Sequence, residues 1–175
     1  GAVGPEPQTL SPSLSPSQSR DAELLPVLRA CDLLVYCGHG AGEALADRRH
    51  FAELRRCASA LLIGCSSGAL KREGSFEPDA LVLRYLIAGS VGVTTCLWDV
   101  TDKDIDGFTL RMLEEMQGAP FPSSSEPNPN PKPTPQPKSM PAAAAAAREG
   151  CKLKHLTGAA PVVYGVPATW THASP

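Results

Sequence analysis

Three short apolar runs alternate with segments of helical periodicity in the middle of the chain. The runs cover residues 32–37, 60–64 and 90–97, and each has the length of a strand that is buried on both faces. Gly38 follows the first run and Cys65 follows the second. The third run is rich in β-branched residues, which favour strands. The pattern therefore predicts three buried strands.

Two amphipathic helices are predicted between and after these strands. The first covers residues 78–88, with Pro78 suited to a first helical turn and Gly89 to a C-terminal cap. Thr101 with Asp104 three residues later resembles a capping box that opens the second helix. The apolar face of this second helix carries Ile105, Phe108, Met112 and Met116.

Strands that alternate with helices predict parallel pairing and right-handed crossovers, hence an α/β fold with a mainly parallel sheet flanked by helices. Ligands of such sheets bind at the carboxyl ends of the strands. Three loops are expected at this edge, formed by residues 38–40, 65–68 and 98–102. They contain His39, Cys65 and Asp99, whose side chains can transfer protons, act as a nucleophile or bind a cation.

Proline divides the chain into domains. The 175 residues include 18 prolines, about twice the usual frequency of roughly 5%. Residues 1–26 are rich in Ser and Pro and are expected to form a disordered linker, and residues 119–147 a disordered insert rich in Pro and Ala. The six alanines within the insert are too few to hold a helix without packing. A core at residues 27–118 and a C-terminal segment at residues 148–175 remain.

The formal net charge of −2 gives no electrostatic reason to expect a nucleic acid or an acidic membrane as partner. No apolar run reaches the roughly 18 to 20 residues of a membrane span, and the N-terminus lacks the pattern of a signal peptide. The six cysteines lie mostly in apolar stretches, which is typical of free thiols in a reducing compartment. We expect a cytosolic or nuclear protein. Its start at Gly1 indicates a fragment or a processed product.

His39 and Cys65 follow two strands that are expected to be neighbours, and they are 26 residues apart. A thiolate that attacks a carbonyl carbon and an imidazole that transfers protons are the groups needed for nucleophilic thiol catalysis. The N–H groups of Gly40 and Cys65 are candidate donors to an oxyanion. Glycine next to such groups lets a substrate backbone approach closely.

Two other interpretations of these residues remain open. His39 can be a turn residue and Cys65 a small buried apolar residue, because free cysteine is among the most buried residue types. Alternatively, Cys37 and His39 supply metal ligands together with Cys65 or Cys96, although the chain has no paired C-x-x-C motif. The other cysteines are assigned to the core.

An acidic run begins in the loop after the third strand, with Asp99 and Asp102. Carboxylates at this position stabilise the N-terminus of the following helix through its dipole. The alternative is a pocket for a cationic side chain. Asp99 lies on the loop itself and is best placed for that role, whereas Asp104 and Asp106 are expected on the helix and facing solvent.

Four motifs resemble the C-terminal catalytic domain of separases: LLVYCGHGAGE, LLIGCSSGAL, DALVLRYLIAGSVGVTTCLWDVTDKDIDGFTLRML and LKHLTGAAPVVYGVP. They occur in the family's order. The resemblance covers about residues 30–117 and 151–168.

The resemblance implies a caspase-like fold and a cysteine endopeptidase that needs no cofactor or metal. On this basis His39 and Cys65 form the catalytic dyad, and the segment with Asp99 and Asp102 forms part of an acidic pocket for a substrate arginine. The implied substrate is the kleisin subunit of cohesin, cleaved after Arg at anaphase. Securin is the implied inhibitor, cyclin B with its kinase a further partner, and cytoplasm and nucleus the location.

The chain also departs from the family. The linker stands where strands before His39 are expected, and the long helical region that binds securin is absent, so the domain is expected to be incomplete. A catalytically silent fragment that serves as a binding surface is therefore one alternative. A caspase-like peptidase of the CHAT type is another, but the strings GHGAGE and AAPVVYG favour separase.

Overall fold

The computed structural model describes residues 24–43, 48–72, 74–121 and 136–170. Most of the linker expected over residues 1–26 lies outside these stretches, and so do residues 122–135 of the expected insert. Within the described stretches no helix is long and apolar enough to cross a membrane.

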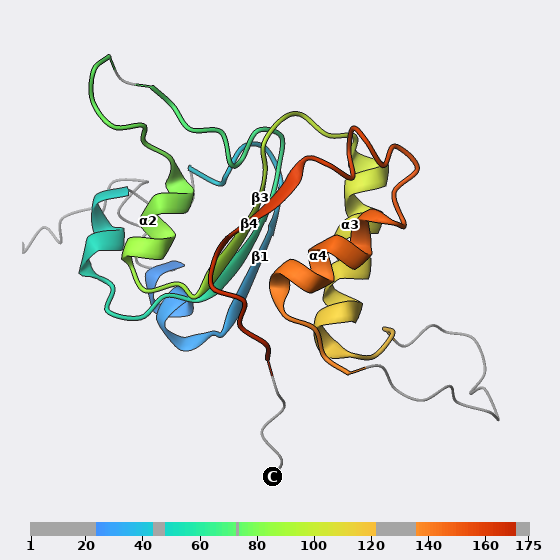
Figure 1. Ribbon diagram of the computed structural model, residues 1–175. Coiled ribbons are helices and arrows are strands. Elements are labelled where there is room, and N and C mark those ends of the chain that lie inside the picture. Colours follow the sequence, from blue (N-terminus) through green and yellow to red (C-terminus); the bar gives the residue numbers. More distant parts are fainter. Residues whose placement is uncertain (1–23, 44–47, 73, 122–135, 171–175) are drawn as a thin grey trace, which may run out of the picture.

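A four-stranded sheet forms the centre of the molecule, with the strands in the order β1-β2-β3-β4 (Figure 1). Strands β1 (Leu33–Cys37), β2 (Ser59–Ile63) and β3 (Gly92–Cys96) are parallel, and they confirm the three predicted strands. Strand β4 (Pro161–Gly165) was not predicted and pairs antiparallel with β3. The α/β class and the mainly parallel sheet are thereby confirmed.

Helices cover both faces of the sheet (Figure 1). A helix over residues 24–30, the 3-10 helix η1 (Arg48–Glu53) and α2 (Leu81–Ile87) pack on one face. Helices α3 (Asp102–Gln117) and α4 (Met140–Arg148) pack on the other. The sheet is therefore the middle layer of three, which is why its central strands consist of continuous apolar runs.

Strand β2 shows how the two cores are built. All five of its residues are buried, and successive side chains point to opposite faces. Ala60 and Leu62 belong to the core under α2, whereas Leu61 and Ile63 belong to the core under α3 and α4. Both faces of β2 are apolar for this reason.

Helix α2 begins at Leu81, later than predicted. The main chain of Asp79 forms two hydrogen bonds with Lys71, as donor over 3.0 Å and as acceptor over 2.8 Å. This antiparallel bridge holds residues 78–80 outside the helix, so the prediction that Pro78 lies in the first turn is wrong. Gly89 follows the helix with a φ of +93°, as a C-terminal cap requires.

Helices occupy part of both flanks that were expected to be disordered. The helix over residues 24–30 includes the last three residues of the expected linker, and its Leu28 is fully buried. The C-terminal part of the expected insert is also ordered, because Met140–Arg148 forms α4. The alanines hold this helix because Ala143, Ala144 and Ala147 bury their methyl groups in the core shared with α3. Packing supplies what the short run lacks alone.

The capping box predicted at the start of α3 is not formed. Thr101 is the N-cap residue, but its side chain makes no capping hydrogen bond. Asp104 was expected to face solvent, and it is partly exposed in the first turn of α3. Its carboxylate accepts hydrogen bonds from the N–H groups of Lys152 and Leu153, at 2.8 and 3.0 Å.

Candidate active site

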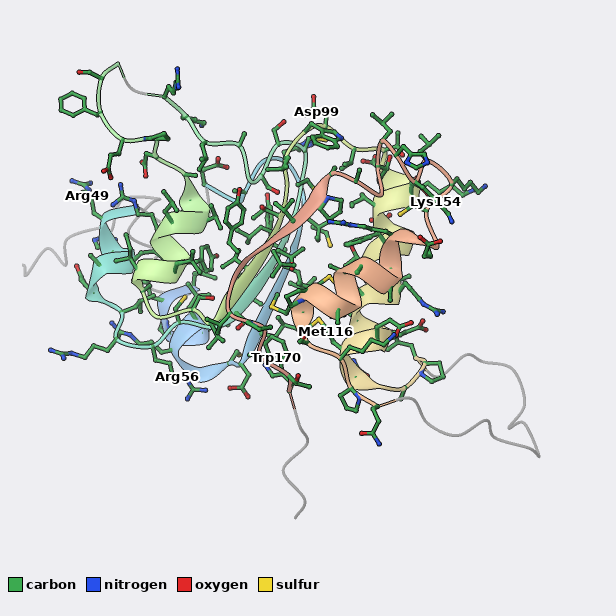
Figure 2. All side chains as sticks on the ribbon, viewed as in Figure 1. Arg49, Arg56, Asp99, Met116, Lys154 and Trp170 are labelled. Atoms are coloured by element: carbon green, nitrogen blue, oxygen red, sulfur yellow. The ribbon has the colours of Figure 1, made fainter. Side chains whose placement is uncertain are left out.

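Three loops meet at the carboxyl ends of β1, β2 and β3, as the parallel topology predicts. The N–H of Gly38, after β1, donates to the carbonyl oxygen of Ile63 over 3.2 Å. The N–H of Ser66, after β2, donates to the carbonyl oxygen of Trp98 over 3.2 Å. The loops with His39, Cys65 and Asp99 are therefore adjacent along one edge of the sheet, and Figure 2 shows Asp99 at this end.

Gly64 brings the His39 loop against the residue before Cys65. A Cβ atom built on Gly64 would overlap the carbonyl oxygens of Gly38 and Gly40. Only glycine fits this contact, because any side chain would push the two loops apart. The glycines beside His39 and Cys65 were expected to leave room for a substrate backbone, and the contact of Gly64 with the His39 loop was not predicted.

The His39 loop is shaped by its own hydrogen bonds. The Tyr36 hydroxyl donates to the carbonyl oxygen of His39 over 3.0 Å, and the N–H of Ala41 donates to Oε2 of Glu43 over 3.0 Å. Gly40 has a φ of +61°, a left-handed conformation that glycine adopts without strain. The His39 side chain itself is exposed at the edge of the sheet.

Cys65 is half-buried, and its thiol contacts the main chain of Val100. The N–H of Val100 lies 3.4 Å from Sγ as a donor, and its carbonyl oxygen accepts from the thiol over 3.5 Å. No hydrogen bond between described residues joins Cys65 to the imidazole of His39. Sequence reasoning missed Val100, because a main-chain contact leaves no trace in residue type.

Two serines hold the Cys65 loop on the neighbouring strand. Ser66 has a φ of +54°, which is uncommon outside glycine, and its Oγ donates to Oδ1 of Asp99 over 2.7 Å. Buried Ser67 donates from Oγ to the carbonyl oxygen of Leu62 over 2.6 Å and accepts from the N–H of Cys96 over 2.8 Å. The loop is thereby fixed to both β2 and β3.

The two other cysteines near this edge differ from Cys65 in their surroundings. Burial raises the pKa of the Cys96 thiol to about 12, and the nearby Cys65 acts in the same direction. Burial, and to a lesser extent the charge of Asp106, raises the pKa of Cys37. Both therefore stay neutral thiols at physiological pH and lack the thiolate that a nucleophile needs.

The acidic residues separate into different roles. Asp99 is exposed and bonded to Ser66, next to Cys65, while Asp102 is exposed in the first turn of α3. The effect of Asp106 on Cys37 places its charge near the end of β1. The Asp104 carboxylate is bonded to the main chain of Lys152 and Leu153, as described above.

No three metal-binding side chains come together in the described stretches of the chain. The metal alternative built on Cys37 and His39 with Cys65 or Cys96 therefore gains no support from the geometry. Cys96 is fully buried in the core under α3 and α4, away from solvent. Every proposed site residue, in contrast, is at least partly accessible.

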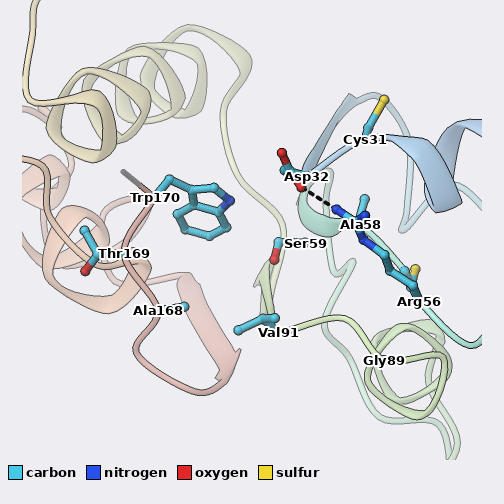
Figure 3. Close-up of a pocket in the computed structure, with 11 residues that line it drawn as sticks. Cys31, Asp32, Arg56, Ala58, Ser59, Gly89, Val91, Ala168, Thr169 and Trp170 are labelled. Carbon is cyan, nitrogen blue, oxygen red and sulfur yellow. Dashed lines mark hydrogen bonds and ion pairs between the residues drawn. The ribbon is translucent and has the colours of Figure 1, made fainter. Parts of the chain in front are cut away.

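A pocket of about 160 Å³ lies at the opposite end of the sheet (Figure 3). It is lined by residues that precede β1 and β2 and by the segment after β4, including Trp170. Nη2 of Arg56 and Oδ1 of Asp32 form an ion pair across 2.6 Å at its wall. Figure 2 shows Arg56 and Trp170 far from Asp99, so this pocket is separate from the candidate site.

Comparison with known proteins identifies relatives over most of the chain. The family described as "Separin, protease domain" matches residues 13–105. The separin of Schizosaccharomyces pombe is 43% identical over 156 residues, which cover 87% of this chain and 8% of that protein. The Mus musculus separin is 40% identical over 140 residues, covering 78% of this chain and 6% of that protein. The chain thus spans under a tenth of these relatives.

A solved structure also matches the fold. The Saccharomyces cerevisiae separase-securin complex at 2.6 Å resolution contains a chain with a TM-score of 0.72 and 37% identity. The match covers 86% of this chain and 9% of the separase chain. Sequence and structure therefore agree with each other and with the resemblance carried by the four motifs. On these grounds, the chain belongs to the separin protease-domain family.

Proposed function

We propose that this chain carries the catalytic centre of a separase-type cysteine endopeptidase, with Cys65 as nucleophile and His39 as the proton-transfer group. One observation carries the proposal. The backbone of the His39 loop lies directly against Gly64, the residue before Cys65, at the edge of the sheet where ligands of parallel sheets bind.

The proposed reaction follows the chemistry of thiol peptidases. His39 takes the proton of the Cys65 thiol, and the resulting thiolate attacks the substrate carbonyl carbon and forms a tetrahedral oxyanion. Protonation of the leaving amine by His39 lets the C–N bond break and leaves a thioester on Cys65. A water molecule, deprotonated by His39, then attacks the thioester, releases the acid product and restores the thiol.

The N–H groups of Gly40 and Cys65 are the proposed oxyanion donors. Neither donates a hydrogen bond to another residue within the described part of the chain. Both lie beside the Gly64 contact, on the two loops that would flank the substrate carbonyl. Two preorganised donors of this kind stabilise charge that develops only in the transition state.

We propose that Asp99 receives a substrate arginine, with Asp102 in the first turn of α3 as a second carboxylate. A guanidinium that enters a cleft loses water, and a carboxylate compensates this loss best through charge-assisted hydrogen bonds. Asp99 is the acid nearest to Cys65 along the bonded network, because Ser66 links the two. Cleavage after Arg is the expected consequence.

The biological role follows from family membership. We propose that the protein containing this chain cleaves the kleisin subunit of cohesin and so acts in chromosome segregation and the cell cycle, in cytoplasm and nucleus. The matching yeast structure is a separase-securin complex, which supports securin as the partner that inhibits this chain. Cyclin B and its kinase are proposed as additional partners.

The test is labelling with a peptide acyloxymethyl ketone that ends in arginine, followed by mass spectrometry. The expected result is one adduct, on Cys65, that is absent in Cys65→Ser. An adduct on a different cysteine would reject the nucleophile assignment. No adduct in the full-length protease would favour the alternative of a catalytically silent binding surface.

A further inference from the structure

The loop that contacts Cys65 is held in place by a segment about fifty positions further along the chain. We propose that Asp104 is a positioning residue for Cys65: by binding the main chain at Lys152 and Leu153, it keeps the loop of residues 97–101 against the sulfur. This inference rests on the proposed function of Cys65. It assigns a role to an acidic residue that the arginine pocket does not use.

Three residues of the loop of residues 97–101 contact the Cys65 loop on the side that faces the candidate site. Val100 contacts the sulfur of Cys65 through its N–H and its carbonyl oxygen. Trp98 accepts a hydrogen bond from the N–H of Ser66 through its carbonyl oxygen, and Asp99 accepts one from the Ser66 hydroxyl. The loop position therefore determines the surroundings of the nucleophile.

The far side of the same loop is bonded to residues 152–160. The indole N–H of Trp98 donates to the carbonyl oxygen of Leu156 over 3.0 Å. The N–H of Leu97 donates to the carbonyl oxygen of Ala160 over 2.9 Å. Asp104 adds the two bonds from the N–H groups of Lys152 and Leu153, at 2.8 and 3.0 Å. Each bond joins the loop, or the first turn of α3, to the same segment.

Asp104 makes the strongest of these links. Its two carboxylate oxygens each accept one bond, and hydrogen bonds to an ionised acceptor are about twice as strong as neutral ones. At the third position of α3, a carboxylate ordinarily reaches back to its own helix cap. Here it bonds to a distant segment instead, so the first turn of α3 is fixed in space rather than merely capped.

Packing does not fill the junction that Asp104 spans. A cavity of about 310 Å³ lies beside these bonds and is lined by Thr101, Asp104 and Leu153, among others. Val100 is partly buried against the core under α3 and α4, and the hydrogen bonds of Asp104 add a polar restraint beside this open groove. Loss of these bonds would let the first turn of α3 and the Val100 peptide shift together.

The consequence for chemistry lies in the bond from Val100 to sulfur. An N–H donor stabilises the thiolate, which is the reactive form of cysteine. If Val100 moves away, Cys65 loses this donor even though its own loop is unchanged. Cys96 interacts electrostatically with Cys65, and Asp99 is bonded to the adjacent Ser66; both residues, and His39 on the neighbouring loop, are kept in the variants below.

The experiment measures alkylation of Cys65 by iodoacetamide in the full-length protease, with mass spectrometry of the Cys65 peptide. Rates are compared at about pH 7 and about pH 9.5, where most ordinary thiols are ionised. Asp104→Asn is expected to slow alkylation about three- to tenfold at the lower pH, because a donor to sulfur is lost, and less than twofold at the higher pH. Lys103→Ala, on the same turn, is the matched control and is expected to react as wild type.

Trp98→Phe provides a second variant, because it removes the indole N–H that binds Leu156 while an aromatic ring remains at the position. It is expected to change alkylation in the same direction by a smaller factor. Wild-type rates at both pH values in Asp104→Asn would overturn the proposal, and so would an equal loss at both, which indicates altered access alone. If Asp104→Asn fails to fold, wild-type rates in Trp98→Phe overturn it instead. Alkylation does not require peptidase activity, so a wild-type protease that cleaves no peptide would reject the proposed function separately.

Discussion

Ser66 Oγ donates a hydrogen bond to Oδ1 of Asp99 over 2.7 Å, and this bond joins the residue after the proposed nucleophile to the proposed arginine-binding carboxylate. Ser66 also adopts a left-handed backbone conformation, with a φ of +54°. Such a conformation costs energy for a residue with a Cβ atom and persists only where its surroundings enforce it. A shift of the Ser66 backbone would therefore move both the proposed nucleophile and the proposed arginine-binding carboxylate.

Asp99→Asn is expected to lower kcat/KM for arginine substrates by about two to four orders of magnitude, because it removes one partner of a charge pair worth about 3 to 5 kcal/mol when buried. Cys65 is expected to remain reactive towards iodoacetamide. Cleavage of an arginine peptide and alkylation are measured on the same preparation. A greater loss in Asp102→Asn or Asp106→Asn than in Asp99→Asn would move the pocket to that residue.

Cys65→Ser and His39→Ala are each expected to reduce peptide cleavage to background. The double variant is expected to be no worse than either single one, because two residues that act as a unit fail together. Cys31→Ser is the control and should cleave normally, since Cys31 lies at the opposite end of the sheet. Substantial cleavage by either single variant would remove that residue from the dyad.

Gly64→Ala is expected to destabilise the domain by about 1 to 3 kcal/mol or more, because its methyl group overlaps the carbonyl oxygens of Gly38 and Gly40. Gly107→Ala is the matched control. A Cβ atom there meets nothing within 4 Å, and alanine is favoured over glycine within a helix by about 0.5 to 1 kcal/mol. Denaturant unfolding should show opposite signs for the two variants. Equal stability of Gly64→Ala and wild type would disprove the close contact.

Replacement of residues 122–135 by about six Gly and Ser residues is expected to preserve stability and cleavage within a few-fold. Both ends of this segment are bonded to neighbouring residues of α3. The N–H of Phe121 donates to Glu114, and Lys138 binds Glu115, so a short linker can join them. A deletion extended through Ala147 should instead unfold the domain, because it removes the buried face of α4. Thermal unfolding separates the two outcomes.

Glu115 is expected to make the free energy of unfolding fall as the pH is lowered into the acid range. The hydrogen bond from Lys138, followed by further charge interactions with Lys138 and Arg111, lowers the pKa of Glu115 below its ordinary value of 4.5. Its contribution is therefore complete above about pH 4.5 and is lost as the pH falls through the lowered pKa. Glu115→Gln should be less stable than wild type at neutral pH, by about 1 kcal/mol or less. Thermal unfolding across pH should show the difference vanish in acid, and a constant difference would contradict the assignment.

The strands and the positions of His39 and Cys65 were predictable because strands buried on both faces appear as uninterrupted apolar runs. Parallel connection then places the ends of these runs, and the residues after them, at one edge. The roles of Val100 and Asp104 were not predictable. Both depend on main-chain contacts with residues 35 to 49 positions away. Every residue type has main-chain N–H and C=O groups, so these contacts leave no pattern in the sequence.

Helix α4 and strand β4 were missed for different reasons. The alanine run has the propensity of a helix but not the length, and only burial against α3 decides the outcome. Residues 161–165 do carry a strand pattern, but they follow the Pro-rich stretch and run antiparallel, so the alternation of parallel strands and helices did not lead to them. Tertiary packing supplied the missing information in both cases.

The antiparallel pairing of β3 with β4 has a consequence for folding during synthesis on the ribosome. Pro161, where β4 starts, follows Cys96, the last residue of β3, by 65 positions. At a synthesis rate of about 5 to 20 residues per second, β4 is synthesised about 3 to 13 s after β3. During that interval one edge of β3 is unpaired and open to strands of other nascent chains. The loops around Cys65 and Asp99 therefore gain their contacts with residues 152–160 and β4 only seconds after β3 has been synthesised.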